Sequence, residues 1–157
     1  MIPKIARRSF LASAAASGAL AAFPMRAETA ATIHVSKGTG CECCTAWVAH
    51  LRTEGFTVTE EELYGMLLIN YKLDNGIPQN MTSCHTGKID GYMIEGHVPA
   101  ADIRRLLDER PDAIGLAVPG MPYGSPGMGD EADREAFEVF LIRPDGATEI
   151  FTSYPAA

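Results

Sequence analysis

The sequence predicts a single α/β domain behind a removable N-terminal leader. Residues 31–76 contain two strand-like alternations of apolar and polar residues, and each is followed by a helix-like repeat of apolar residues. Residues 137–154 contain two further alternating runs around a Pro-Asp-Gly turn, which predicts a closing β-hairpin. Behind the leader, residues 28–157 are long enough to bury one hydrophobic core, so one domain is expected.

The expected leader is residues 1–27, "MIPKIARRSFLASAAASGALAAFPMRA". A basic start followed by a short, apolar run of small residues is typical of a secretory signal peptide and too short for a membrane span. Arg7 and Arg8, followed by Phe10 and Leu11, resemble the twin-arginine export signal, although an ordinary secretory signal is the alternative. We expect cleavage after Ala27 and a periplasmic product.

The charge of the remaining chain excludes some partners. Removing residues 1–27 takes away four of the 13 basic residues and no acidic one, so nine basic residues remain against 20 acidic residues, a formal net charge of −11. Such a surface repels nucleic acid and anionic membranes. No second apolar run is long enough to cross a bilayer, so no membrane span is expected after signal removal.

The first half of the domain follows the order strand, helix, strand, helix. Residues 31–40, "ATIHVSKGTG", alternate and then break on glycines, which predicts a strand followed by a loop. Residues 44–55 have apolar positions at helical spacing and end on a glycine, residues 56–61 alternate as a second strand, and residues 61–76 favour a second helix. The first loop and helix contain three of the four cysteines.

The second half is more irregular. Residues 87–98, "GKIDGYMIEGHV", predict a strand pair or a single bent strand, and residues 99–112 predict a helix with proline in its first turn. Residues 115–135, "GLAVPGMPYGSPGMGDEADRE", are rich in glycine and proline without a period, so we expect a long loop. Long loops in compact domains are often functional.

The cluster "CECC" allows three interpretations. Four cysteines in an exported protein favour structural disulfides, but Cys43 and Cys44 are neighbours and cannot pair without strain. Cys41 and Cys44 form a C-x-x-C pair at a predicted helix N-terminus, where the helix dipole favours a thiolate. That placement is typical of a thioredoxin-like thiol-disulfide oxidoreductase, in which Cys43 has no clear role. We retain this redox interpretation as the alternative.

The third interpretation is a soft-metal site. Thiolate ligands select copper(I), zinc or iron-sulfur clusters, and the chain offers Cys41, Cys43, Cys44 and Cys84, with His85 directly after Cys84. Zinc is less favoured because its sites usually draw sulfurs from two separated pairs. Successive helical side chains diverge by about 100°, so adjacent cysteines suit several ions bridged by thiolates better than one ion. The pattern therefore predicts more than one copper(I) ion.

Other donors are candidates from position alone. Met128 lies between two glycines in the predicted long loop, where a thioether has little core to fill, so we add it to the expected ligands. Met121 in the same loop and His97 between the predicted strand and helix are left open, because Met121 can simply pack the loop onto the domain and His97 can simply pair with Glu95 or Asp102.

Three blocks of the sequence resemble the CopG-like family of small exported proteins. They are "KGTGCECCTAWVAHLRTEGF", "MTSCHTGKIDGYMIEGHVPAADIRRLL" and "GLAVPGMPYGSPGM". The resemblance implies a thioredoxin-like fold for residues 28–157, with a mixed sheet, flanking helices and a C-terminal hairpin. It also implies copper binding through the clustered cysteines and a role in copper tolerance. Copper ions and other copper-handling proteins are then the expected partners, and a copper-linked oxidoreductase activity stays open.

Overall fold

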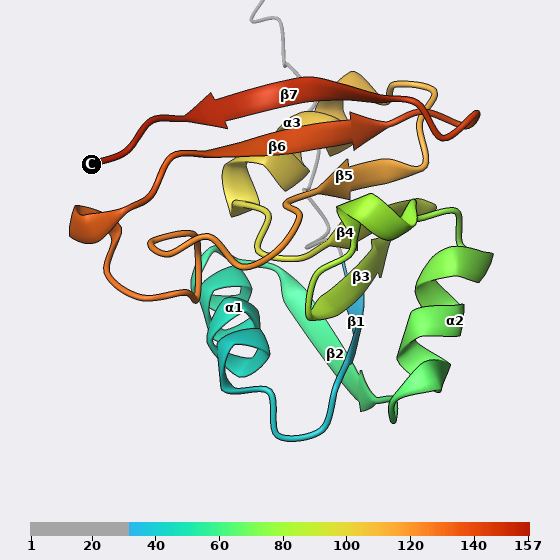
Figure 1. The fold of residues 1–157 in the computed structure, drawn as a ribbon, viewed down its shortest axis with the longest axis horizontal. Helices are drawn as coiled ribbons and strands as arrows, with labels where there is room; N and C mark the ends of the chain where they lie inside the picture. The colour runs from blue at the N-terminus through green and yellow to red at the C-terminus, as the bar shows by residue number, and fades with distance from the viewer. Residues whose placement is uncertain (1–31) are drawn as a thin grey trace, which may run out of the picture.

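The computed structural model describes residues 32–157, which form one seven-stranded mixed sheet with three α-helices (Figure 1). The strand order is β2-β1-β3-β4-β5-β6-β7. The predicted signal peptide, its twin-arginine pair and the expected cleavage site after Ala27 lie outside the described residues. A mixed α/β domain with flanking helices and a C-terminal hairpin is therefore confirmed.

The chain opens with a strand-helix-strand unit. Strands β1 (Thr32–Lys37) and β2 (Thr57–Glu62) pair in parallel, joined by helix α1 (Glu42–Thr53). The apolar residues of α1 recur at helical spacing, so one stripe is buried, including Trp47 and Leu51. The helix begins at Glu42, two residues earlier than predicted, so both adjacent cysteines lie in its first turn.

Helix α2 (Met66–Asp74) begins later than the predicted residue 61, because β2 continues to Glu62. A 3-10 turn, η1 (Gln79–Met81), leads into the strand pair β3 (His85–Ile89) and β4 (Tyr92–Glu95). These two strands are antiparallel, and β3 is also antiparallel to β1. Of the two arrangements expected for residues 87–98, the structure has the strand pair.

The predicted long loop was wrong at its start, because β5 (Gly115–Ala117) is a strand parallel to β4. Three residues are too few to show an alternating pattern. Only glycine fits at position 115, because a Cβ there would lie 1.7 Å from the carbonyl oxygen of Met93. Helix α3 (Ala100–Glu109) precedes this strand, and a 3-10 turn, η2 (Glu131–Asp133), follows it. Strands β6 (Phe137–Ile142) and β7 (Thr148–Tyr154) form the predicted hairpin.

Helices cover both faces of the sheet. The larger buried cluster joins α1 and α3 to one face, through Trp47 and Ile103 among others. The smaller cluster lies on the other face, where Tyr71 of α2 packs against Met93 and its neighbours. Among residues 32–157, none of the helices has the length and apolar character needed to span a bilayer. The start of α1 and the start of β3 meet beside the end of β1, and the cysteines lie there.

Candidate metal centre

Local backbone structure brings three cysteines into one turn. The loop after β1 turns at Gly40, which has a φ of 70°, a conformation that glycine adopts without strain. Cys41 is the N-cap of α1, and the next two cysteines occupy the first helical turn. Cys44 points into the core with no exposed surface, whereas Cys41 and Cys43 are half-buried. The helix N-terminus thus presents sulfurs in different directions.

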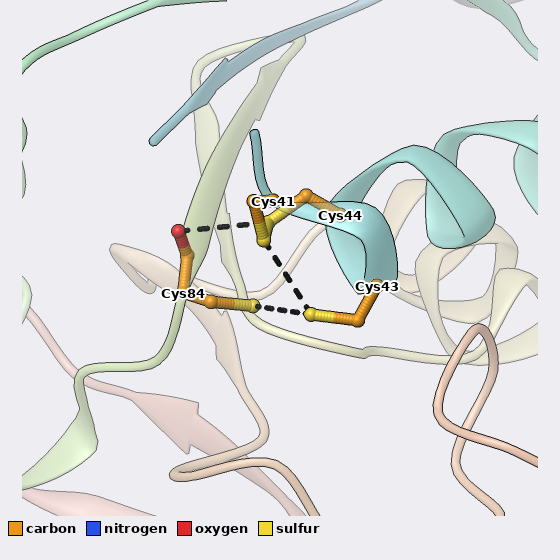
Figure 2. Close-up of side chains that lie close together, drawn as sticks. All are labelled: Cys41, Cys43, Cys44 and Cys84. Carbon is orange, nitrogen blue, oxygen red and sulfur yellow. Dashed lines mark hydrogen bonds between the residues drawn. A yellow bond between two sulfur atoms is a disulfide. The ribbon is translucent and has the colours of Figure 1, made fainter. Parts of the chain in front are cut away.

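The fourth cysteine, Cys84, completes the cluster from the position directly before β3. The Cys43 Sγ lies 3.4 Å from the Cys41 Sγ and 3.8 Å from the Cys84 Sγ (Figure 2). All four sulfur atoms lie within 4.8 Å of one another. Cys41 and Cys44 are joined as a disulfide, while Cys43 and Cys84 are free. Cys43 therefore stands between the disulfide and Cys84, 41 residues further along the chain.

Two histidines also lie close to Cys84. Its Sγ lies 3.2 Å from the Nδ1 of His85 and 3.2 Å from the Nε2 of His97. The Nδ1 of His97 is 2.8 Å from the carbonyl oxygen of Pro126, which only accepts hydrogen bonds. This partner assigns the hydrogen to Nδ1 and leaves the Nε2 lone pair directed at Cys84. His97, which the sequence left open, thus belongs to the cluster.

His85 is fully buried, and its environment supports a ligand role. The ring lies 4.3 Å from that of Trp47 and 4.9 Å from that of His97, measured between centroids. Its Nε2 has no hydrogen-bond partner among residues 32–157. The ligand role rests on the other ring nitrogen, Nδ1, which lies 3.2 Å from the Cys84 Sγ. A metal ion bound through Nδ1 would leave the hydrogen of the neutral ring on Nε2.

Burial sets the protonation states of this cluster. Desolvation, reinforced by the neighbouring Cys43, raises the pKa of Cys84 to about 12, so Cys84 is a thiol without metal. Desolvation lowers the pKa of His97 and lowers that of His85 well below its usual value, so both rings are neutral at neutral pH. Neutral imidazoles are the form that binds metal, and metal binding would displace the Cys84 proton.

The glycine- and proline-rich loop closes over the start of α1. A Cβ on Gly127 would lie 2.6 Å from the backbone nitrogen of Trp47 and 3.0 Å from the carbonyl oxygen of Cys43. Met128 follows directly, and its amide donates to Ser125. These contacts bring the backbone of Met128 near the cluster, and its thioether stays a predicted ligand. Met121 in the same loop is 53% exposed.

Sequence reasoning missed a buried ion pair next to the cluster. Lys72 of α2 and Glu95 of β4 are joined by a 2.5 Å contact between Nζ and Oε1, and both side chains are almost fully buried. A signal was present, because Lys72 lies four residues after the buried Leu68 and so falls on the core side of its helix. A lysine at such a position requires a buried partner.

The donor set has a definite chemistry. Cysteine and histidine suit copper, zinc and iron, and the thiolates favour soft ions such as copper(I). Two groups of donors within 4.8 Å share Cys84, namely the four cysteines on one side and Cys84, His85 and His97 on the other. Together they offer six potential ligands from the start of α1, the start of β3 with the residue before it, and the turn after β4. Such a set has more donors than one four-coordinate ion uses.

Comparisons with known proteins agree with this chemistry. Residues 81–128 match a family described as "Protein of unknown function, DUF411". Two solved structures named "Copper resistance protein copG", Form 2 and Form 1, are 43% and 44% identical to the chain, each with a TM-score of 0.74. Each comparison covers 80% of this chain and 98% of the other. No curated protein matches the chain.

Proposed function

Since the chain belongs to the CopG-like family, and two solved structures that it resembles are named copper resistance proteins, we propose that it binds copper(I) and acts in copper tolerance. The observation that carries the proposal is that the donor atoms of five other residues lie close to the Cys84 sulfur. Three other sulfurs form one group of donors with this residue, and two imidazole nitrogens form a second group with it. Thiolate and imidazole are the ligand types that hold copper in proteins.

The proposed site holds more than one ion. Cys43 stands 3.4 Å and 3.8 Å from two other sulfurs that approach from different sides. A thiolate in that position has lone pairs for two ions and can bridge them. Cys41, Cys43, Cys44, Cys84, His85 and His97 are the proposed ligands, and Met128 is a further candidate at the edge. Zinc remains the less favoured ion because one closed tetrahedral site would leave donors unused.

Copper binding at this site is coupled to the state of the disulfide. Cys41 and Cys44 are paired to each other, and a disulfide sulfur is a far weaker ligand than a thiolate. Full loading therefore requires two electrons and two protons from a dithiol reductant, which converts the disulfide into two thiols. The reduced chain then offers four thiols and two neutral imidazoles, and the thiols lose protons as copper binds.

The same disulfide favours a second candidate function. A C-x-x-C disulfide at the N-terminus of the first helix of a strand-helix-strand unit is the arrangement of thioredoxin-like oxidoreductases. This placement supports our proposal that the fold is thioredoxin-like. In this alternative, Cys41 and Cys44 exchange disulfides with a substrate, or the thiols cycle together with copper.

One pair of measurements separates the two functions. The chain is purified without oxygen, its metal content is determined by elemental analysis, and the reduction potential of its thiols is measured on the same preparation. A stable content of several copper ions without turnover of disulfide substrates supports the copper-binding function. A metal-free dithiol that cycles with a disulfide substrate contradicts it and supports the oxidoreductase. Zinc offered at the same concentration is the control for metal selectivity.

We further propose that the protein acts in the periplasm after twin-arginine export. Export of a folded chain would let the thiols be protected or loaded in the reducing cytoplasm before they meet an oxidising compartment. Replacement of Arg7 and Arg8 by lysine is expected to stop export, measured as loss of the protein from the periplasmic fraction. Unimpaired export of that variant would refute the folded-export proposal. Other copper-handling proteins are the proposed partners for delivery of the metal.

A further inference from the structure

The buried pair of Lys72 and Glu95 has no part in the site as described so far. The Lys72 side chain is 3% exposed and that of Glu95 is fully buried. Desolvation makes such a pair a poor source of stability, and apolar residues of similar volume often serve folding equally well. A buried ion pair that borders a candidate metal centre therefore invites another explanation.

The pair belongs to a closed network of hydrogen bonds. The Lys72 Nζ donates to the Glu95 Oε1 at 2.5 Å and to the Thr86 Oγ1 at 2.7 Å. Since the Thr86 hydroxyl accepts from lysine, its own hydrogen is free to be donated to the Glu95 Oε2. Thr86 and Glu95 lie opposite each other on β3 and β4, and α2 brings Lys72 over them. Lys72 thus uses two of its three N–H donors in the network, and both oxygens of the Glu95 carboxylate accept hydrogen bonds.

The network holds both ends of the short segment that contains Cys84 and His85. The Glu95 Oε1 accepts a 2.6 Å hydrogen bond from the backbone amide of Ser83, the residue before Cys84. The hydroxyl of Thr86, the residue after His85, donates to the other oxygen of the same carboxylate. One carboxylate thus holds the positions on either side of the Cys84–His85 pair. Glu95 is also two residues before His97, so the end of β4 is fixed by the same contacts.

We propose that Glu95, held by Lys72, is a positioning residue that fixes Cys84, His85 and His97 for metal binding. The proposal rests on the proposed copper site. Residues that orient metal ligands through hydrogen bonds typically change metal affinity 10–100-fold when they are replaced, although they never touch the ion. Lys72 acts one step further away, because it supplies the charge that lets the carboxylate stay buried.

Two double variants test the proposal, and they differ only at residue 95. Lys72→Met with Glu95→Leu removes both charges and the acceptor for the Ser83 amide. Lys72→Met with Glu95→Gln also removes both charges, but an amide oxygen can still accept from Ser83. Copper(I) affinity of the reduced chain is measured by competition with a chelator of known affinity. We expect a loss of about 10–100-fold in the leucine variant and near-complete rescue in the glutamine variant.

Thermal unfolding of the reduced, metal-free variants separates positioning from folding. A purely structural pair would change the unfolding temperature in step with copper affinity, whereas a positioning pair lowers affinity in a variant that still folds. Lys88→Met is the matched control, because Lys88 is an exposed lysine on the same strand as Thr86, and its affinity should not change. Equal affinity losses in the leucine and glutamine variants would overturn the proposal, as would no loss in either.

A measurement without copper distinguishes a failure of the positioning role from a failure of the proposed copper-binding function. In the metal-free reduced chain, the rate at which iodoacetamide alkylates Cys84 reports how often its segment opens. Loss of the acceptor for Ser83 should raise this rate about tenfold or more in the leucine variant. An unchanged rate refutes the positioning role even where the wild-type chain binds copper. If the leucine variant does not fold, Thr86→Val carries the test, and unchanged alkylation and affinity in it would equally refute the role.

Discussion

Replacement of Cys43 by serine is the most informative single change in the cluster. The substitution keeps the shape of the side chain and exchanges a soft sulfur for a hard hydroxyl oxygen, which is a poor ligand for copper(I). Cys43 lies 3.4 Å from the Cys41 sulfur and 3.8 Å from the Cys84 sulfur. Without it, the ligands of α1 and those around Cys84 lose the atom that bridges them.

The expected effects on folding and on binding differ in size. Cys43 is half-buried in the first turn of α1 and is not in the disulfide, so folding stability should change by about 1 kcal/mol or less. For a domain of this size, that corresponds to a shift in Tm of about 4 °C at most. Replacing a residue that only orients a ligand lowers metal affinity about 10–100-fold. Replacing a ligand itself should have a larger effect, so copper affinity should fall more than about 100-fold.

The assay measures copper stoichiometry and affinity of the reduced variant without oxygen, with thermal unfolding of the metal-free chain alongside. Thr45→Ser is a suitable control, because this exposed residue lies two positions after Cys43 in the same helix and the substitution removes only a methyl group. The variant at Cys43 should keep its fold and lose ions. Unchanged stoichiometry and affinity would refute the bridging role and make the Cys41–Cys44 oxidoreductase the better explanation.

Three further outcomes follow from the structure. Oxidation that leaves Cys41 and Cys44 paired should lower copper stoichiometry, and treatment with a dithiol should restore it; equal loading of both forms would show that these sulfurs are not ligands. Gly127→Ala should destabilise the chain by about 1–3 kcal/mol in thermal unfolding, because its φ is +85° and a Cβ would meet backbone atoms of α1. Gly120→Ala is the control, since its φ is +69° but the space around it is open, and it should lower the stability less. Burial holds the pKa of His85 well below its usual 6.5, so the unfolded chain binds more protons just below pH 6.5. Stability of the metal-free chain should therefore fall as pH drops through about 6.5, and His85→Gln should flatten that slope in denaturant titrations.

The sequence predicted most elements because their signals are local. The spacing of Trp47 and Leu51 indicated α1, and the alternation around Pro144 and Gly146 indicated the C-terminal hairpin. Strand β5 was missed because its three residues are too short for a pattern and depend on pairing with β4. The last residue of β2, Glu62, was assigned to the next helix, since glutamate favours helices locally.

The sequence indicated the members of the cluster that are cysteines or that directly follow one. The cluster of Cys41, Cys43 and Cys44 is visible by eye, and Cys84 and His85 were added because thiolate and imidazole suit copper. His97 could not be assigned, because its approach to Cys84 depends on the pairing of β3 with β4 and on a carbonyl group of a distant loop. Glu95 was hidden for the same reason, since its role appears only when Ser83 and Thr86 are brought to it.

Native mass spectrometry of the reduced chain, loaded with copper(I) without oxygen, tests the central claim most directly. Four sulfurs and two imidazoles around one shared cysteine predict more than one copper ion per chain. The expected spectrum therefore contains a dominant species with several ions, and this species should be lost in the Cys43→Ser variant. A spectrum with at most one ion per chain would contradict the multinuclear copper site.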